Sequence, residues 1–342
     1  MKGVVFTGNR TAEVRDFPDP EPGFGEVVVR IRASGMCGSD LHYYRSPEPS
    51  GEEGVPVIQG HEPCGEIAAV GPGVPARTAS VGDRVMIHHY WGCGTCGDCR
   101  SGWPQLCTTM PPRIPTLNEH GGHADFIKVP ASQTIPLPGE LSFRAGAAIG
   151  CGTGTAWGGL VRLGDVAGRD LVVLGQGPVG LSATMLAAVL GARVIAVDVA
   201  QQRVDSARAF GADAVINSAE TDVVQAVRDL THGRGAEVVI ETSGATVAAR
   251  QALEVAATWG RVCFIGLGAD VQFNTRDTLR RQLTLLTSWT MSTVEQMRCA
   301  AFAAERRLPI DDLFSHTWKL DQAVEAYHWF DKQDAGKGVF EP

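Results

Sequence analysis

Four of the nine cysteines fall within residues 93–107, with the spacing Cys93-x2-Cys96-x2-Cys99-x7-Cys107. Four thiolates at this spacing suit a tetrahedral zinc ion, and a site with four protein ligands has no open position, so we expect it to be structural. An iron–sulfur cluster also binds four cysteines, but the spacing and the non-redox neighbourhood favour zinc. In a cytosolic chain, Cys-x-x-Cys repeats are more typical of metal binding than of disulfides.

Three further residues could bind a second metal ion: Cys37 in Gly-Met-Cys-Gly, His61 in Gly-His-Glu, and Cys151 in Gly-Cys-Gly. A single cysteine is usually buried, and a single histidine is usually a surface or hydrogen-bonded residue. Beside a cysteine cluster, two sulfurs and one nitrogen with an open fourth position are instead typical of a catalytic zinc site. The remaining cysteines have no spaced partner, so we interpret them as core or surface thiols: Cys64, Cys263 and Cys299.

A nucleotide-binding motif occupies residues 171–198. A short aliphatic run precedes Gly175, Gly177 and Gly180, and an apolar segment with helical spacing leads to a second aliphatic run. The first glycine permits a tight turn, the second lets a pyrophosphate approach the backbone, and the third lets the helix pack closely on the strand. Free N–H groups at the helix start favour phosphate. A glycine-rich turn in another α/β domain is the alternative, and the agreement of all these parts in register argues against it.

Asp198 distinguishes between the two nicotinamide cofactors. It ends the second aliphatic run, where a carboxylate can accept hydrogen bonds from both ribose hydroxyls of adenosine and would repel a 2′-phosphate. Arg203 is the nearest cation that follows it. The pattern therefore predicts NAD rather than NADP.

Two kinds of architecture must position these residues. Up to about residue 140, short apolar runs such as 4–6 and 27–31 alternate with Gly- and Pro-rich turns, which predicts a β-rich first domain. From about residue 153 to 288, strands alternate with helices, which predicts a doubly wound parallel sheet. The expected strands are 171–174, 194–197, 214–217, 236–241, 260–266 and 283–287, and the expected helices are 181–190, 201–210, 222–230, 246–257, 293–306 and 320–332.

Composition excludes several other classes of protein. A length of 342 residues allows about two domains, and the net charge of −8 disfavours nucleic acid or an anionic membrane as partner. No apolar run approaches the ~20 residues that span a bilayer. The first residues become polar too early for a signal peptide, so we expect a cytoplasmic location.

With these motifs in this order, the chain resembles the zinc-containing medium-chain alcohol dehydrogenase family, which includes threonine and polyol dehydrogenases. Residues 81–85 and 121–126 also resemble family signatures. The resemblance implies a GroES-like catalytic domain over 1–152, a Rossmann NAD-binding domain over 153–290, and a C-terminal segment, 291–342, that returns to the catalytic domain. It also implies an active site in the cleft between the domains. A homodimer or homotetramer would form through the Rossmann edge strand, near 283–287.

The resemblance also assigns roles to individual residues. It implies that Cys37, His61 and Cys151 bind a catalytic zinc ion and that Glu62 approaches the metal during ligand exchange. Ser39 matches the hydroxyl beside the substrate oxygen, and His42 matches the outer member of a proton relay. Residues that match cofactor contacts are Thr155, Val179, Asp198, Arg203, Gly266 and Leu267, together with the three motif glycines.

The implied reaction is zinc-dependent hydride transfer with NAD(H), which interconverts a secondary or polyhydroxy alcohol and its ketone or aldehyde. Polyol dehydrogenases usually carry a carboxylate where this chain has Cys151, whereas His89 is polar where enzymes for simple alcohols are often apolar. His89 either faces the substrate or is a solvated loop residue. The alternatives are a non-catalytic, crystallin-like member, a zinc-free quinone reductase, and a redox-sensing regulator. The intact ligand and relay residues argue against the first two, and a cysteine lobe that bound no metal would favour the third.

Overall fold

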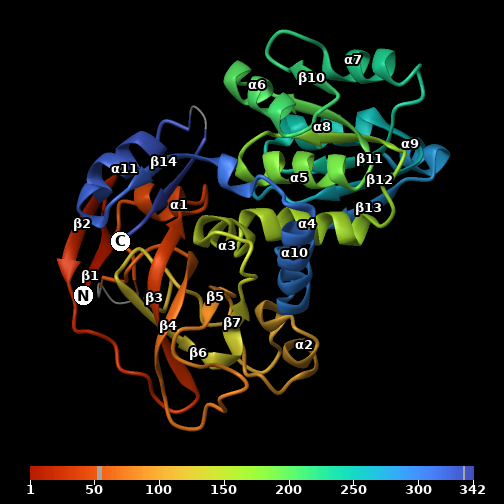
Figure 1. Cartoon of the computed structure of the whole chain (residues 1–342). Coiled ribbons are helices and arrows are strands. Elements are labelled where there is room, and N and C mark those ends of the chain that lie inside the picture. Colours follow the sequence, from red (N-terminus) through yellow and green to blue (C-terminus); the bar gives the residue numbers. More distant parts are fainter. Residues whose placement is uncertain (52–55, 334–335) are drawn as a thin grey trace. The chain divides into compact units, whose positions relative to one another are not determined.

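The protein is described by a computed structural model that covers residues 1–51, 56–333 and 336–342. Its contacts divide the chain into two compact units (Figure 1). Unit 1 contains Met1–Cys151, Ser292–Gln333 and Lys337–Pro342. Unit 2 contains Gly152–Met291 and also takes in Gly336.

Unit 1 is built on a seven-stranded sheet, which confirms the β-rich prediction. Along β3, Val29 and Ile31 are buried while Arg30 and Arg32 are exposed, so one face of the strand packs on the core. The sheet order is β14 (Phe314–Trp318), β15 (Lys337–Phe340), β3 (Glu26–Gly35), β4 (Glu62–Val70), β5 (Arg84–Ile87) and β7 (Thr134–Pro136), with β6 (Phe126–Pro130) also paired to β3. A separate hairpin joins β1 (Lys2–Gly8) to β2 (Thr11–Asp16).

The helices of unit 1 are short, apart from one in the C-terminal segment. They are α1 (Asp40–Arg45), α2 (Gly97–Arg100), α3 (Phe143–Ile149), α10 (Thr293–Arg306) and α11 (Ala323–Phe330), with short 3-10 turns at Pro104–Leu106, Ala131–Gln133, Ile310–Leu313 and Leu320–Gln322. The helix expected at 320–332 therefore begins as a 3-10 turn and ends at Phe330. In α11, Tyr327 packs in an aromatic cluster with Phe6 and Tyr44.

Unit 2 is a six-stranded parallel sheet, which confirms the doubly wound prediction. The sheet order is β10 (Ala214–Asn217), β9 (Arg193–Asp198), β8 (Asp170–Leu174), β11 (Ala236–Glu241), β12 (Ala256–Phe264) and β13 (Thr284–Thr287). Its helices are α4 (Gly152–Leu163), α5 (Pro178–Val189), α6 (Gln201–Ala209), α7 (Val223–Leu230), α8 (Thr246–Val255) and α9 (Thr275–Arg281). Strand β8 is buried along its whole length, as expected of a central parallel strand.

One local prediction in unit 2 was wrong. Ala256 and Ala257 were expected to end a helix, but they begin β12, because Ala256 pairs with Ala236 on the neighbouring strand. No secondary structure was predicted over the glycine-rich α4, whose glycines have low helix propensity. In α4, a Cβ on Gly158 would overlap the carbonyl of Thr290, so these glycines allow close packing that outweighs the propensity cost.

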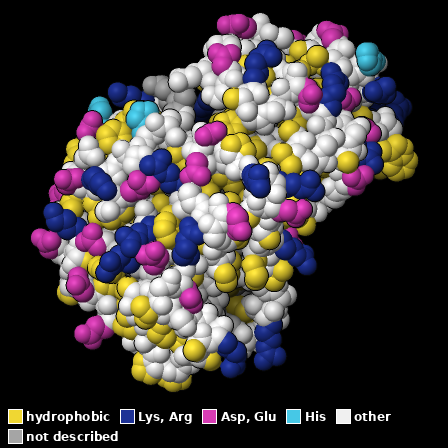
Figure 2. Space-filling view, viewed as in Figure 1, with side chains coloured by type: hydrophobic (Ala, Val, Ile, Leu, Met, Phe, Trp, Pro, Cys, Tyr) yellow, Lys and Arg dark blue, Asp and Glu magenta, His cyan; other side chains and the backbone are white. Residues whose placement is uncertain are grey.

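The surface carries charges of both signs. On the face shown in Figure 2, basic and acidic side chains are interspersed, so their fields partly cancel at short range. Among the described residues, none of the helices combines the length and the apolarity that crossing a bilayer demands.

Candidate metal centres and nucleotide-binding site

The four clustered cysteines converge around one point in unit 1. The Sγ atoms of Cys93 and Cys99 are 3.9 Å apart, and those of Cys96 and Cys107 are also 3.9 Å apart. Four sulfurs at about 2.3 Å from a tetrahedral zinc ion would be about 3.8 Å apart. Hydrogen bonds from Thr95 lower the pKa of the Cys93 thiol to about 5, which makes a thiolate available. The donor set therefore fits a closed zinc site.

A second cluster joins the two sulfurs and the imidazole that sequence spacing left far apart. Sγ of Cys151 lies 3.9 Å from Sγ of Cys37 and 3.6 Å from Nε2 of His61. A tetrahedral zinc ion bound to sulfur at about 2.3 Å and nitrogen at about 2.0 Å would hold these atoms about 3.6–3.8 Å apart. An oxygen of Glu62 also lies within 4.8 Å of the other donor atoms. This cluster fits a zinc ion with three protein ligands.

The sheet of unit 1 brings these ligands together. Strand β3 ends at Gly35 beside Glu62, the first residue of β4, so the antiparallel pair places Cys37 and His61 at the same edge. Cys151 follows α3, whose residues pack against both strands. Cys37 and Cys151 are half-buried and His61 is buried.

Asp40 contacts two of the candidate ligands and was not predicted from the sequence. Its Oδ1 lies 3.0 Å from Nδ1 of His61, and its Oδ2 accepts the backbone N–H of Cys37 at 2.8 Å. A carboxylate on Nδ1 holds the proton there and leaves Nε2 as the ligand atom. Asp40 is completely buried. In the sequence, Asp40 is marked only by its place three residues after the candidate ligand Cys37, and an acidic residue at that spacing is not specific for a role at a metal site.

A buried ion pair lies beside the same cluster. Nζ of Lys337 is 2.6 Å from Oε2 of Glu62 and donates to the carbonyl of Met36 at 2.9 Å. Burial raises the pKa of Glu62 to about 7, although the Lys337 ammonium opposes this shift. Oε1 of Glu62 has no hydrogen-bond partner among the described residues, so one buried oxygen stays available to the donor cluster. Lys337 was also missed, because nothing near it in the sequence marks it.

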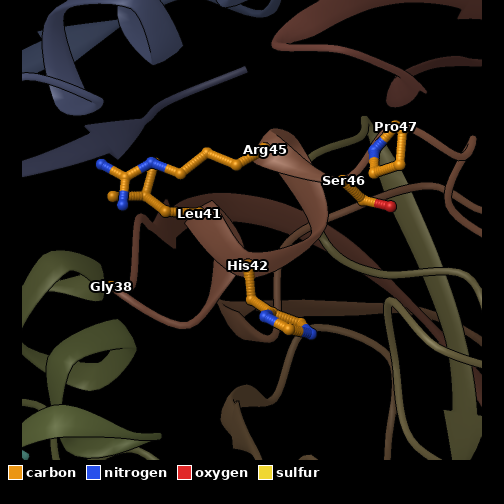
Figure 3. A pocket seen from close by; sticks show the side chains of 6 residues that line it. All are labelled: Gly38, Leu41, His42, Arg45, Ser46 and Pro47. Carbon is orange, nitrogen blue, oxygen red and sulfur yellow. The ribbon is translucent and has the colours of Figure 1, made fainter.

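Ser39 and His42 follow Cys37 on α1. The Ser39 hydroxyl is not used to cap the helix; it lies 3.3 Å from Sγ of Cys37 and 3.4 Å from Nε2 of His61. His42 is exposed and lines a shallow pocket (Figure 3) together with Gly38, Leu41, Arg45, Ser46 and Pro47. Figure 3 shows the His42 ring and the Arg45 side chain leaving α1 in different directions. Arg45 is held by Asp331 at 2.5 Å.

The glycine motif of unit 2 has the predicted turn geometry. Gly175 has a φ of +88°, which L side chains rarely adopt, and a Cβ on Gly180 would overlap the carbonyl oxygen of Gly175. At Gly177 nothing lies within 4 Å of the position that a Cβ would take, so the backbone there is open. Helix α5 begins at Pro178, directly after this glycine.

The other candidate cofactor residues lie on three segments of unit 2. Asp198 is buried at the end of β9, where its two carboxylate oxygens accept the N–H groups of Gln176 at 2.6 Å and Ala200 at 2.9 Å. Arg203 lies 3.9 Å from the same carboxylate. Thr155 is on α4, Val179 is on the neighbouring α5, and Gly266 and the exposed Leu267 follow β12.

His89 is not the solvated loop residue that one interpretation expected. It is 3% exposed, and its ring centroid lies 5.2 Å from that of His61. Nδ1 donates to the carbonyl of Gly150 at 3.0 Å, since a carbonyl only accepts. Nε2 therefore remains available for a second hydrogen bond close to the metal ligands.

Comparisons with known proteins identify the family. Residues 23–139 match a model of the alcohol dehydrogenase GroES-like domain, and residues 178–305 match a model of zinc-binding dehydrogenases. An uncharacterized zinc-type alcohol dehydrogenase-like protein of Escherichia coli K12 is 36% identical, over 99% of this chain and 98% of its own length. The chain belongs to the zinc-containing medium-chain alcohol dehydrogenase family.

Other members of this dehydrogenase family are also similar along their whole length. A sorbitol dehydrogenase of Halalkalibacterium halodurans is 30% identical over 100% of this chain and 99% of its own. The solved structure of alcohol dehydrogenase TADH from Thermus sp. ATN1 is 30% identical, with a TM-score of 0.92 over 100% of this chain and 99% of that one. The predicted family and the α/β fold, GroES-like and Rossmann, are confirmed. The protein is an oxidoreductase of the zinc-type dehydrogenase family, whose members act on small molecules.

Proposed function

We propose that this dehydrogenase uses zinc and NAD(H) to interconvert a secondary or polyhydroxy alcohol with its ketone or aldehyde. The observation that carries this proposal is the convergence of Cys37, His61 and Cys151 around one open position, with the Ser39 hydroxyl beside it. The catalytic zinc ion would be held by these three residues, and the structural zinc ion by the four-cysteine cluster. Unit 1 would act as the catalytic domain and unit 2 as the NAD-binding domain.

Each residue near the open position would have a distinct task. When bound, zinc supplies Lewis acidity that lowers the pKa of an alcohol, and NAD accepts a hydride. Ser39 would take the hydroxyl proton from the alcohol, because its oxygen adjoins Cys37 and His61. His42, exposed on the same helix, would exchange that proton with solvent. Glu62 offers a buried oxygen that can enter the donor set while ligands exchange.

His89 supports a substrate with more than one polar group. Its buried ring adjoins His61, and because Nδ1 carries the proton, Nε2 can accept a hydrogen bond there. A site built to hydrogen-bond a substrate hydroxyl rejects analogues that lack it, because the buried group is then left unpaired. We therefore propose that a second hydroxyl lies near His89. A homodimer or homotetramer formed through β13, at the edge of its sheet, is part of the same proposal.

The first experiment follows NADH formation with NAD or NADP and a panel of primary alcohols, secondary alcohols, diols, polyols and threonine. We expect NAD-dependent turnover of secondary alcohols or polyols. Preference for a diol over the matching mono-alcohol would support the role of His89. Protein that holds two zinc ions and turns over no member of the panel would contradict the proposed function.

Asp198 should set the cofactor preference. Replacing it by alanine removes the carboxylate that would accept the adenosine ribose hydroxyls, and hydrogen bonds to charged groups contribute about 1.5–3 kcal/mol, or about 10–100-fold. We expect kcat/KM for NAD to fall by about that factor, while activity with NADP falls less or rises.

Asp213 offers a matched control for Asp198. Its carboxylate also accepts a backbone N–H, that of Val194 at 2.8 Å, but at the opposite end of β9. Asp213→Ala should leave the ratio of NAD to NADP activity unchanged. Equal ratios in wild type and Asp198→Ala would show that Asp198 does not select the cofactor.

A further inference from the structure

A chain of buried hydrogen bonds extends from the cluster of Cys37, His61 and Cys151 into the core of unit 1. The Tyr327 hydroxyl lies 3.3 Å from Oδ2 of Asp40 and 2.8 Å from Nε2 of His123. Nδ1 of His123 lies 2.7 Å from the hydroxyl of Ser34. All four side chains are completely buried. The proposed reaction uses none of the outer three groups, Tyr327, His123 and Ser34.

We propose that Tyr327 and His123 are positioning residues for the Cys37–His61–Cys151 metal site, acting through Asp40. This inference rests on the proposed function, since it concerns how tightly that site holds its metal ion. Asp40 connects these residues to the metal site, because it contacts both Cys37 and His61.

The chemistry of the groups fixes the direction of these hydrogen bonds. As a carboxylate, Asp40 only accepts, so Tyr327 must donate its single hydroxyl proton to Oδ2. The Tyr327 oxygen then accepts from Nε2 of His123. Burial lowers the pKa of His123 to about 4, which makes the ring neutral, so Nδ1 accepts from Ser34. The chain thus runs from Ser34 to Asp40 with every proton placed.

This direction matters for His61. Oδ1 of Asp40 lies 3.0 Å from Nδ1 of His61, and Oδ2 accepts the N–H of Cys37 and the O–H of Tyr327, so contacts at both oxygens orient the carboxylate. A carboxylate whose orientation is fixed holds the imidazole at one angle, with Nε2 aimed at the other donor atoms. Without the Tyr327 donor, Oδ2 keeps one partner and the carboxylate gains freedom to rotate.

Packing holds the outer members of the chain in place. The His123 ring lies against Gly60, where a Cβ would overlap the ring, and Gly60 directly precedes His61. The same ring contacts Phe340 at 4.7 Å between centroids. Tyr327 meets Phe6 edge to face at 4.6 Å. The hydroxyl of Tyr327 is therefore held in position by contacts that Tyr327→Phe would keep.

Tyr327→Phe removes only the hydroxyl, and Tyr44→Phe is its matched control. Tyr44 is buried in the same aromatic cluster, 5.3 Å from Tyr327, but its hydroxyl lies outside the chain of hydrogen bonds. Outer partners of metal ligands typically contribute about 10–100-fold in metal affinity. We expect Tyr327→Phe to weaken zinc binding at the Cys37–His61–Cys151 site by about 10-fold. We expect Tyr44→Phe to leave zinc binding at that site unchanged.

The measurement is competition for zinc with a chromophoric chelator, using the full chain. Zinc bound at the four-cysteine site, which lies outside this chain of hydrogen bonds, serves as the internal reference. Substitution with cobalt adds a second readout, since the d–d absorption bands respond to ligand angles, and we expect these bands to shift in Tyr327→Phe alone. His123→Phe, which deprives Tyr327 of its donor, should shift zinc affinity in the same direction.

Each outcome decides something definite. Unchanged zinc affinity and unchanged cobalt bands in Tyr327→Phe, with two zinc ions in wild type, would overturn this inference and leave the proposed function standing. Equal losses in Tyr327→Phe and Tyr44→Phe would also overturn it, because they would reflect packing alone. A wild-type chain that bound zinc only at the four cysteines would overturn the proposed function as well.

Discussion

Cys151→Ser should leave one zinc ion per chain where the wild type holds two. Serine keeps the shape of the side chain, but a neutral hydroxyl replaces a thiolate, and the cluster of Cys37, His61 and Cys151 loses one of its three ligands. Lewis-acid assistance contributes several kcal/mol, and about 4 kcal/mol corresponds to about 10³-fold in rate. We expect turnover to fall by at least that factor, with metal content measured by elemental analysis.

Cys99→Ser makes the complementary change at the other cluster. It should release the structural zinc ion and lower the Tm, because metal binding at a closed cysteine site contributes directly to folding. Cys151→Ser should lower the Tm much less. If Cys151→Ser retained two zinc ions per chain, Cys151 would not be a ligand and the proposed site would be wrong.

Ser39→Ala should separate proton transfer from metal binding. The Ser39 hydroxyl adjoins Cys37 and His61 without belonging to the set of metal donors, so its removal should leave both zinc ions in place. A positioned proton acceptor typically contributes 10²–10⁴-fold to rate. We expect kcat to fall by about 10²-fold or more, with little change in zinc content or Tm.

Ser46→Ala provides the control for this change. Ser46 caps the other end of α1, and its hydroxyl accepts the N–H of Glu48 at 3.1 Å. It should retain wild-type kcat. Near-normal turnover in Ser39→Ala would remove Ser39 from the proton path, while loss of zinc in that variant would show that its effect is structural.

The sequence predicts most of the fold because the relevant patterns are local. A buried strand such as β8 and the turn at Gly175 are each encoded within a few residues. The limits of β12 were misplaced because alanine favours helices, whereas the pairing of Ala256 with Ala236 depends on a neighbouring strand. Tertiary contacts of this kind leave no local signal.

In the candidate site too, some residues are marked by local patterns and others are brought in only by tertiary contacts. The donor types at Cys37 and His61 stand out because cysteine and histidine are rare and follow recognisable glycines. The residues that support them, Asp40, Lys337 and Tyr327, are of ordinary types in ordinary segments. The antiparallel pairing of β15 with β3, next to β4, brings Lys337 to Glu62, and the packing of α11 in the aromatic cluster brings Tyr327 to Asp40.

Tyr327 and Lys337 follow the rest of the candidate site by almost 200 residues in the sequence, and this separation has a consequence for folding. Lys337 and Met36 are 301 positions apart, and β15 must reach β3 before the sheet of unit 1 is complete. Contacts at such separation form slowly. Unit 2 comes almost entirely from the continuous stretch Gly152–Met291, so it can fold during synthesis while unit 1 still lacks two strands. Until the segment that holds Tyr327 and Lys337 emerges from the ribosome, Asp40 lacks the Tyr327 hydroxyl and Glu62 lacks the Lys337 ammonium. The three candidate zinc ligands are then already present, but the buried contacts that support them are incomplete.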